Sequence, residues 1–144
     1  MILEMSPSEV EEFVLSQKVG RVGCHVGGET YVVPVIFGWD GNCIYVYTTE
    51  GKKVDMMREN QRVCFEIDEY LTSGAWRSVI AQGVFEELEG DDAVRALEII
   101  SERVSSNREN RETVNSRPRG EGRTPVAFRI RTSDVTGRKV EVNS

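Results

Sequence analysis

Hydroxyl, glycine and lysine residues that could bind a phosphate occur together in "YTTEGKK", residues 47–53. The candidate groups belong to Thr48, Thr49, Gly51, Lys52 and Lys53. The residues that follow predict a short helix over about 51–59, whose N-terminal amides would point at an anion bound there. The stretch therefore fits an anion site. The alternative is an ordinary helix start, with Thr49 as its cap and the lysines in solvent.

Two other stretches carry groups that could contact the ring of an aromatic cofactor. Pro34 has no amide hydrogen, so within the apolar stretch 30–39 it marks a strand edge or bulge with free backbone groups nearby. Free backbone groups beside apolar side chains suit the polar rim of an aromatic ring system. In "WRSV", residues 76–79, Arg77 lies in an otherwise apolar strand and needs a carboxylate partner or an anion. A solvent-facing Arg77 is the alternative.

Residues for other common chemistries are missing from the sequence. It contains no GxSxG, HExxH, GxxxxGK[ST] or glycine-rich dinucleotide motif. Cys24, Cys43 and Cys64 lie in apolar stretches without CxxC spacing, so they predict small buried side chains rather than a metal site or disulfides. His25, the only histidine, is adjacent to Cys24 and so points to the opposite face of a strand. This argues against a Cys–His nucleophile.

The composition fits one soluble globular domain spanning residues 1–144, with a net charge of −6. No apolar run reaches the roughly 20 residues of a membrane helix, and no signal peptide is evident, so we expect a cytoplasmic protein that binds no membrane. Residues 101–144 are basic, with 10 Lys or Arg against 6 Asp or Glu. Glu102, Glu109, Glu112 and Glu121 alternate with the arginines, and no aromatic residue lies between Phe85 and Phe128. A flexible loop over 105–124 is therefore favoured over nucleic-acid binding.

The elements that position these residues follow from capping, periodicity and turn signals. A capping box, "SPSE", opens a helix that ends near Gln17, and a second amphipathic helix covers 90–104. The short helix at 51–59 should end with Asn60 in a left-handed conformation. Strands are predicted at 19–26, 30–39, 42–49, 62–68 and 75–88, and a last strand with a short edge segment within 125–142. Gly83 predicts a bend or bulge, and the order of elements predicts a small, mainly β barrel with peripheral helices.

Both faces of the strand at 30–39 are apolar. Val33, Val35 and Phe37 alternate with Val32, Pro34 and Ile36. A strand with a solvated outer face would alternate with polar residues instead. A partner subunit or a flat apolar ligand is expected to cover the outer face. The alternative is that the helices at the N-terminus and at 91–104 cover it alone.

Three stretches in this order resemble one family: "YVVPVIFGWDGNCIYVYTTEGKKVDMMRENQRVCFEID", "WRSVIAQGVFEEL" and "FRIRTSDVTGR". The chain is similar to the pyridoxamine 5'-phosphate oxidase-related flavin-binding proteins, in particular to their nitroimidazole-resistance-like branch. The resemblance extends over roughly residues 5–140. It implies a six-stranded antiparallel split β-barrel that forms a homodimer, with one FMN at each end of the subunit interface.

The resemblance also assigns site residues. The isoalloxazine ring would lie against Val33, Pro34, Val35 and Ile36. The phosphate and ribityl chain would be held by Thr48, Thr49, Lys52 and Lys53. Polar contacts toward the flavin would come from Ser78, with Arg77 and Val79 beside it, and from Arg138 of the partner subunit. Tyr47 stands where the branch often carries histidine, which places any mechanism based on that imidazole in doubt.

The function that the resemblance implies is an FMN-dependent oxidoreductase acting on a small molecule, with a nicotinamide as a candidate electron donor. The C-terminal region lacks the tryptophan and basic cluster with which pyridoxamine phosphate oxidases hold their substrate, so vitamin B6 oxidation is not favoured. The alternative from another class is a carrier or sensor of flavin, haem or deazaflavin without turnover. For haem, His25 would be the only histidine available as an axial ligand.

Overall fold

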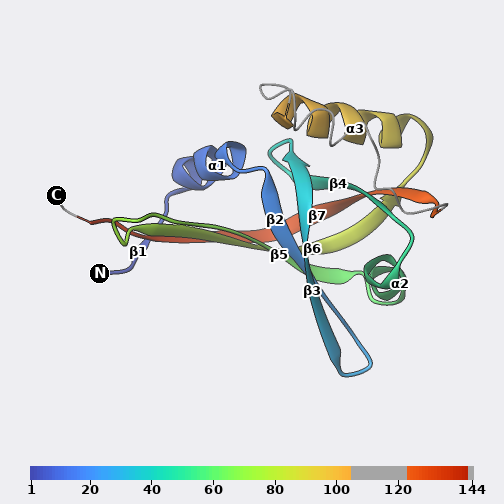
Figure 1. The fold of residues 1–144 in the computed structure, drawn as a ribbon, viewed down its shortest axis with the longest axis horizontal. Coiled ribbons are helices and arrows are strands. Elements are labelled where there is room, and N and C mark those ends of the chain that lie inside the picture. Colours follow the sequence, from blue (N-terminus) through green and yellow to red (C-terminus); the bar gives the residue numbers. More distant parts are fainter. Residues whose placement is uncertain (105–122, 143–144) are drawn as a thin grey trace.

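A computed structural model describes residues 1–104 and 123–142 of the chain. Figure 1 shows the helices and strands in space. In chain order they are β1 (Leu3–Glu4), α1 (Pro7–Ser16), β2 (Val19–Val26), β3 (Glu29–Trp39), β4 (Cys43–Thr49), α2 (Lys52–Glu59), β5 (Arg62–Tyr70), β6 (Trp76–Leu88), α3 (Gly90–Val104) and β7 (Pro125–Val140). No described helix is long and apolar enough to cross a membrane. Most of the loop predicted at 105–124 lies outside the described residues.

The strands form one antiparallel sheet that closes on itself. Its order is β1-β7-β4-β3-β2-β5-β6, and β6 also pairs with β7, so that six strands form a ring. The mainly β barrel expected from the sequence is therefore confirmed. The count of six strands is wrong, because the described residues contain seven: β1 adds Leu3 and Glu4 to the edge of β7. A strand this short cannot produce a periodic pattern.

A bulge in β6 lets the long strands of the ring bend. The pairing of β6 with β7 shifts register between Gln82 and Gly83, as the glycine predicts. A Cβ atom at Gly83 would lie 2.5 Å from the backbone oxygen of Arg131 and 2.7 Å from the side chain of Ile130. Only glycine allows the two strands to approach this closely. β7 continues past the bulge as one 16-residue strand, where a strand and a separate edge segment were expected.

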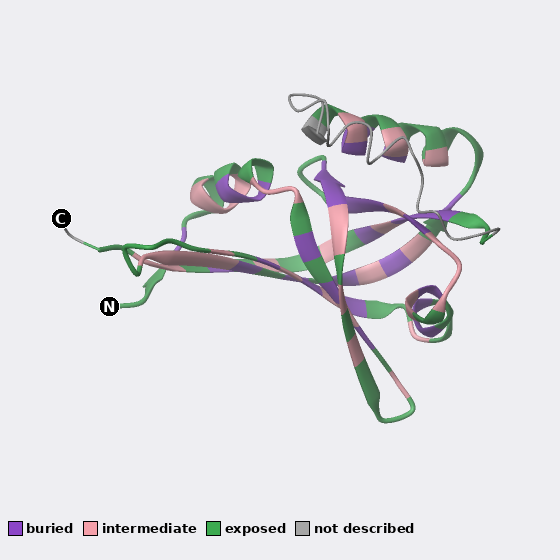
Figure 2. Cartoon of the chain, in the orientation of Figure 1, coloured by how far each residue is buried: buried purple, intermediate pink, exposed green. Residues whose placement is uncertain are grey.

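Two apolar clusters hold the fold together. The main cluster fills the ring and includes four fully buried phenylalanines, Phe13, Phe37, Phe65 and Phe128. The second cluster joins α3 to β4 and β7, with Ala96, Ile99 and Ile100 against Tyr45 and Ala127. Figure 2 shows the buried positions of α3 facing these strands. The two clusters pack against the two faces of β4, the strand that leads into the "YTTEGKK" stretch.

The predicted helix ends agree with the structure at α1 but not at α2. Ser6 accepts from the backbone amide of Glu9, and the Glu9 carboxylate accepts from the amide of Ser6, which confirms the capping box. At α2 the N-cap is Gly51, so the alternative in which Thr49 caps this helix is wrong. Asn60 is extended, with φ −131°, rather than left-handed. Its side chain instead bonds to the backbone oxygen of His25.

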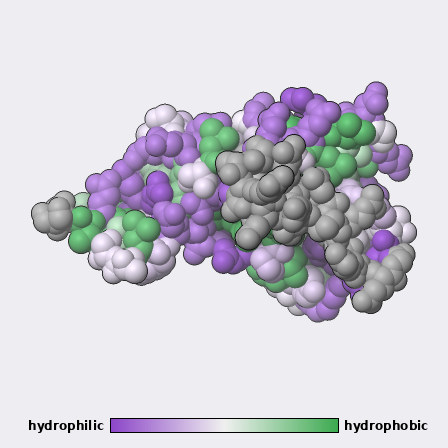
Figure 3. Space-filling model, turned by 45° about the horizontal axis from the view of Figure 1, so that its top comes forward, coloured by the Kyte–Doolittle hydropathy of each residue, from purple (hydrophilic) through white to green (hydrophobic). Residues whose placement is uncertain are grey.

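The hairpin of β5 and β6 extends with β7 beyond the ring as a flat arm, on which α1 lies (Figure 1). Both chain termini lie at the end of this arm. The large apolar side chains exposed there are Met1, Ile2, Leu3, Tyr70, Leu71 and Val142. Part of this apolar surface is visible beside the C-terminus in Figure 3.

Candidate functional site

The ring of strands is weakest between β3 and β4. β4 pairs with β3 only at Phe37, Gly38 and Trp39, whereas β3 pairs with β2 over residues 29–36. From residue 29 to residue 36, β2 is the only strand that pairs with β3 in the described part of the chain. β4 meanwhile continues along β7 to Thr49. One edge of β3 is therefore open beside the end of β4 and the start of α2.

The backbone groups at this open edge can be identified from the register. Phe37 donates its amide hydrogen to the backbone oxygen of Lys18, at 3.1 Å. Because hydrogen-bonded and non-bonded pairs alternate in an antiparallel ladder, Val35 and Val33 also bond toward β2. The backbone groups of Pro34 and Ile36 therefore point to the open edge. The missing amide hydrogen of Pro34 removes no bond to β2, and the edge position predicted for it is confirmed.

The side chains of this segment divide between the two faces of β3. Val33 and Val35 pack against the main core, and Ile36 packs against the α3 cluster. Val32 is 59% exposed and Pro34 is also exposed. The helices therefore do not cover the outer face alone. The described residues leave Val32 and Pro34 exposed.

The end of β4 places one polar group inside the barrel. Thr48 follows Ile44 and Val46 on the core-facing side of the strand and is 8% exposed. It is the only polar residue in the buried class among the described residues, and its hydroxyl makes no hydrogen bond to another described residue. A buried hydroxyl without a partner is unusual in a folded protein. Tyr47 points to the other face and packs against the α3 cluster, and Thr49 is half-buried.

Lys52 and Lys53, the first two residues of α2, differ in their partners. The Lys52 ammonium lies 2.6 Å from a carboxylate oxygen of Glu29 and 4.9 Å from the centre of the Tyr31 ring. Hydrogen bonding to Glu29 raises the pKa of Lys52. Lys52 therefore ties α2 to the β2–β3 hairpin and has its countercharge within the chain. Neither Glu29 nor Tyr31 was predicted as a site residue, because their contact with Lys52 appears only when the hairpin folds back on α2.

Lys53 has no carboxylate partner in the described residues. It is half-buried, and burial lowers the pKa of its ammonium group. The positive charge of Arg123 lowers the pKa further, while Cys24 opposes the change. The free amides at the start of α2 and the hydroxyl of Thr48 lie close to this residue in the chain. The arrangement lacks only a negative charge, and a phosphate would supply it.

The other predicted residues form a second group on β6 and β7. Arg77 donates to Glu69 at 2.6 Å and stacks on the Phe13 ring at 4.6 Å, so it already has a carboxylate partner. The side chain of Val79 lies in the main core and is 1% exposed. Ser78 and Arg138 pair with each other across the two strands and share the outer face of the arm. Arg138 is exposed.

The residues at the open edge of β3 lie far from Ser78 and Arg138 within one chain. Along the ladder, Pro34 pairs with Arg21, and Arg21 pairs with Glu66. Glu66 pairs with Ile80 of β6, two residues from Ser78. Three strand spacings separate the rows, or about 14 Å at ~4.8 Å per strand. Ser78 and Arg138 therefore cannot contact a ligand at the open edge of β3 in the same subunit.

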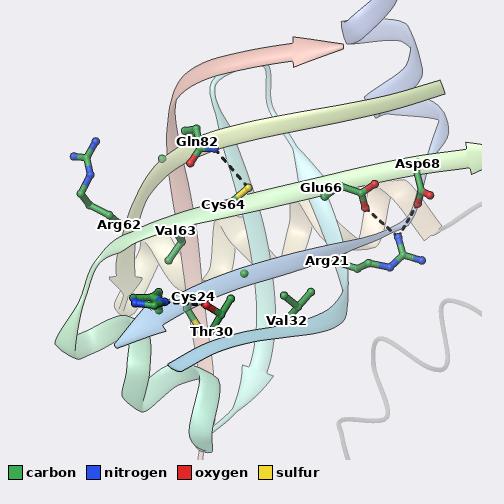
Figure 4. Close-up of a pocket in the computed structure, with 13 residues that line it drawn as sticks. Arg21, Cys24, Thr30, Val32, Arg62, Val63, Cys64, Glu66, Asp68 and Gln82 are labelled. Carbon is green, nitrogen blue, oxygen red and sulfur yellow. Dashed lines mark hydrogen bonds and ion pairs between the residues drawn. The ribbon is translucent and has the colours of Figure 1, made fainter. Parts of the chain in front are cut away.

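A hollow of about 750 Å³ lies on the outer face of the sheet, between β2, β3, β5 and β6 (Figure 4). None of the residues predicted to hold a flavin lines it. Its floor includes Gly23, Val32 and Cys64, and an ion-paired cluster around Arg21 closes one end. This hollow is hard to foresee from the sequence, because a glycine opposite a half-buried cysteine becomes informative only once the strand register is known.

Comparison with known proteins adds a family and several relatives. The family model described as pyridoxamine 5'-phosphate oxidase matches residues 6–139. A FAD-binding protein from Mesorhizobium loti is 26% identical, with a TM-score of 0.77 over 99% of this chain and 98% of that chain. A putative 5-nitroimidazole antibiotic resistance protein from Bacteroides thetaiotaomicron has the same fold, with 20% identity and a TM-score of 0.75 over 98% of this chain and 92% of that chain. An uncharacterized protein from Rhizobium meliloti is 32% identical over 58% of this chain, and the match spans 56% of that relative's length.

Proposed function

The chain belongs to the pyridoxamine 5'-phosphate oxidase family, and we propose that it is an FMN-binding oxidoreductase that acts on a small molecule. The family match over residues 6–139 and the similarity to a FAD-binding protein support a flavin as the cofactor. The observation that carries the choice of FMN is Lys53, which lacks a carboxylate partner in the described chain and follows the buried Thr48 by five residues. One cation, one hydroxyl and one helix start fit a single terminal phosphate.

The proposed phosphate cradle consists of Thr48, Thr49, Lys53 and the first amides of α2. Its groups fit a phosphate for three separate reasons. Among the residues that the structure describes, the buried hydroxyl of Thr48 has no partner and Lys53 has no carboxylate. No side chain caps the first amides of α2, because the N-cap residue is Gly51. Each of these groups costs stability while it is unsatisfied, and an anion would satisfy all of them. Lys52 belongs to the cradle only indirectly, through the carboxylate of Glu29 that it already binds.

The open edge of β3 would hold the flavin ring. Backbone groups of Pro34 and Ile36 point to this edge, and the apolar side chains of Val33 and Val35 stand beside it. The polar residues Ser78 and Arg138 cannot reach it from the same chain. We therefore propose a homodimer in which these two residues come from the second copy, so that each site contains residues of both subunits.

When bound, FMN would supply the hydride or electron transfer, and the protein would supply position and charge. Lys53 and the α2 amides would hold the phosphate end. The β3 edge would orient the polar rim of the ring through backbone hydrogen bonds. The described residues offer no acid or base at this edge, since Tyr47 packs against α3 and His25 lies exposed and bonded to Thr30. The exposed position of His25 also gives no support to haem as the cofactor.

Anaerobic reduction tests the oxidoreductase proposal. The purified protein, loaded with FMN, is mixed with NADH or NADPH, or with dithionite as a control for reducibility. We expect bleaching of the flavin absorbance by at least one nicotinamide and recovery of the absorbance when a nitroaromatic compound or oxygen is added. Bleaching by dithionite alone, with neither nicotinamide active, would instead support a flavin carrier.

A further inference from the structure

The guanidinium group of Arg58 joins two glutamates that lie far apart in the sequence. Its Nη1 and Nη2 atoms donate to the two carboxylate oxygens of Glu50, at 2.7 and 2.8 Å. Its Nε and Nη2 atoms donate to the two oxygens of Glu87, at 2.8 and 2.9 Å. Both contacts are bidentate, which is the geometry in which arginine binds a carboxylate most strongly. These bonds therefore fix the Arg58 side chain, although it is 37% exposed.

The same contacts tie the start of α2 to the end of β6. Glu50 immediately precedes Gly51, the N-cap of α2, and Glu87 is the last residue but one of β6. The backbone amide of Glu50 also donates to the backbone oxygen of Thr124, at 2.9 Å, just before β7 begins. Arg58 itself stands in the last turn of α2. One side chain at the end of the helix thus holds the segment that leads into its start.

The charge of Glu50 would oppose anion binding if this carboxylate were free. Glu50 lies three residues before Lys53, the lysine of the proposed phosphate cradle. A free carboxylate at this position would repel a phosphate and would compete with it for the Lys53 ammonium group. Hydrogen bonding to Arg58 lowers the pKa of Glu50, so the carboxyl stays ionised and keeps its need for a countercharge. Arg58 supplies that countercharge and occupies both carboxylate oxygens.

Two other acids near the start of α2 do not need the same restraint. Glu29 already pairs with Lys52, at 2.6 Å. Asp55 lies 3.8 Å from Arg58, but its side chain is 73% exposed and is therefore screened by water. Glu50 is thus the acid whose release would act on Lys53.

We propose that Arg58 is a positioning residue for the phosphate cradle, which keeps Glu50 bound so that Lys53 remains available to the phosphate of the cofactor. The inference rests on the proposed function and gives a role in it to a residue outside the cradle. Arg58 acts through Glu50 and does not touch the phosphate, because the two glutamates occupy its donors.

Titration of the full chain with FMN and with riboflavin tests this role, because riboflavin lacks the phosphate. Arg58→Met should weaken FMN binding by about fivefold or more and leave riboflavin binding unchanged, since it releases Glu50. Arg58→Met combined with Glu50→Gln should recover the FMN affinity, because the competing side chain is then neutral. Arg131→Met removes an arginine that binds Glu86. It is the matched control and should bind both flavins like the wild type.

The reactivity of Lys53 in the flavin-free protein is a second readout. Release of Glu50 should raise the pKa of Lys53, because a carboxylate then pairs with its ammonium group. Acetylation by acetic anhydride, followed across pH by mass spectrometry, should therefore be slower at Lys53 in Arg58→Met than in the wild type. The double variant should be acetylated at the wild-type rate. Melting curves check that each variant is folded.

The proposal is overturned if Arg58→Met binds FMN like the wild type, if it weakens FMN and riboflavin equally, or if the double variant does not recover. A wild type that binds neither flavin would instead refute the proposed function. The acetylation rate of Lys53 would then still decide the role of Arg58: a slower rate in Arg58→Met would support it, and an unchanged rate would refute it.

Discussion

Two neighbouring lysines at the start of α2 have different partners, and this difference predicts which of them binds phosphate. Lys52 is held by Glu29 and lies over the Tyr31 ring. Lys53 is half-buried and forms no ion pair with a carboxylate among the described residues. Its positive charge is therefore available to pair with a bound anion. A bound phosphate would therefore gain more from Lys53 than from Lys52.

Lys53→Met should abolish the preference for FMN over riboflavin, which lacks the phosphate. Loss of one charge-assisted hydrogen bond of about 1.5–3 kcal/mol corresponds to about a 10- to 100-fold weaker affinity for FMN. Riboflavin affinity should change little. Lys52→Met is the matched variant, and it should keep the preference. Fluorescence titration with both flavins measures this, and the reverse pattern would move the phosphate site to Lys52.

The sequence predicts where the cradle stretch lies but not the roles within it. Hydroxyls, glycine and lysines at 47–53 are visible without a structure. Which lysine is free of a carboxylate depends on Glu29, which lies 23 residues away and reaches Lys52 only through the β2–β3 hairpin. The burial of the Thr48 hydroxyl likewise depends on the closed barrel.

At the scale of elements, the bulge in β6 has a strict steric requirement, because the atom nearest to a Cβ at Gly83 belongs to the backbone. Gly83→Ala should destabilise the fold by about 1–3 kcal/mol, because its Cβ meets the Arg131 backbone, which cannot move without disturbing β7. Gly23→Ala, a glycine-to-alanine change in β2 with only ordinary contacts, should cost much less. Urea unfolding of both variants measures the difference. Equal losses would mean that the bulge is not rigidly held.

The contact between α1 and β7 should depend on pH. The Lys139 ammonium hydrogen-bonds to Glu9 and lowers the pKa of that carboxyl from its ordinary 4.5 to about 2, with help from the amide of Ser6. An acid with a lowered pKa stabilises the fold above its ordinary pKa and loses that contribution as the pH falls through the lowered one. The wild type should therefore lose a stabilising contribution between about pH 4.5 and pH 2.

Glu9→Gln isolates this contribution, since glutamine keeps the capping box. The difference in unfolding free energy between wild type and Glu9→Gln should be largest above pH 4.5 and shrink toward pH 2. Lys139 also binds Glu141, and its hydrogen bonds to Glu141 and Glu9 raise the pKa of Lys139, so the cation keeps one partner in the variant. A difference that does not vary with pH would contradict the assignment.

Most element positions were predictable because alternation and capping act locally. The strands at 19–26 and 62–68 and the helix at 90–104 lie where the sequence places them, with small changes at the ends. The errors occur where a tertiary contact decides. Asn60 is extended because its side chain bonds to His25, and β1 forms because β7 offers it an edge.

At the scale of the whole molecule, one subunit holds only part of the proposed site. The ring of strands is closed, yet its outer face carries exposed valine and isoleucine, an arginine of β5 without a carboxylate in the described chain, and a hollow of about 750 Å³. The apolar pattern on both faces of β3 predicts a cover from the sequence alone. The hollow could be found only from the register of β2 against β5, which brings Gly23 opposite Cys64.

Sedimentation velocity monitored at the visible absorbance of flavin tests the central claim most directly. The protein is mixed with FMN in slight excess over chains, and the flavin that sediments with protein is counted. The account predicts one FMN per chain moving with a dimer, and retention of less flavin by Lys53→Met than by Lys52→Met. Flavin that sediments at the rate of free FMN, while the protein stays folded, would contradict the account.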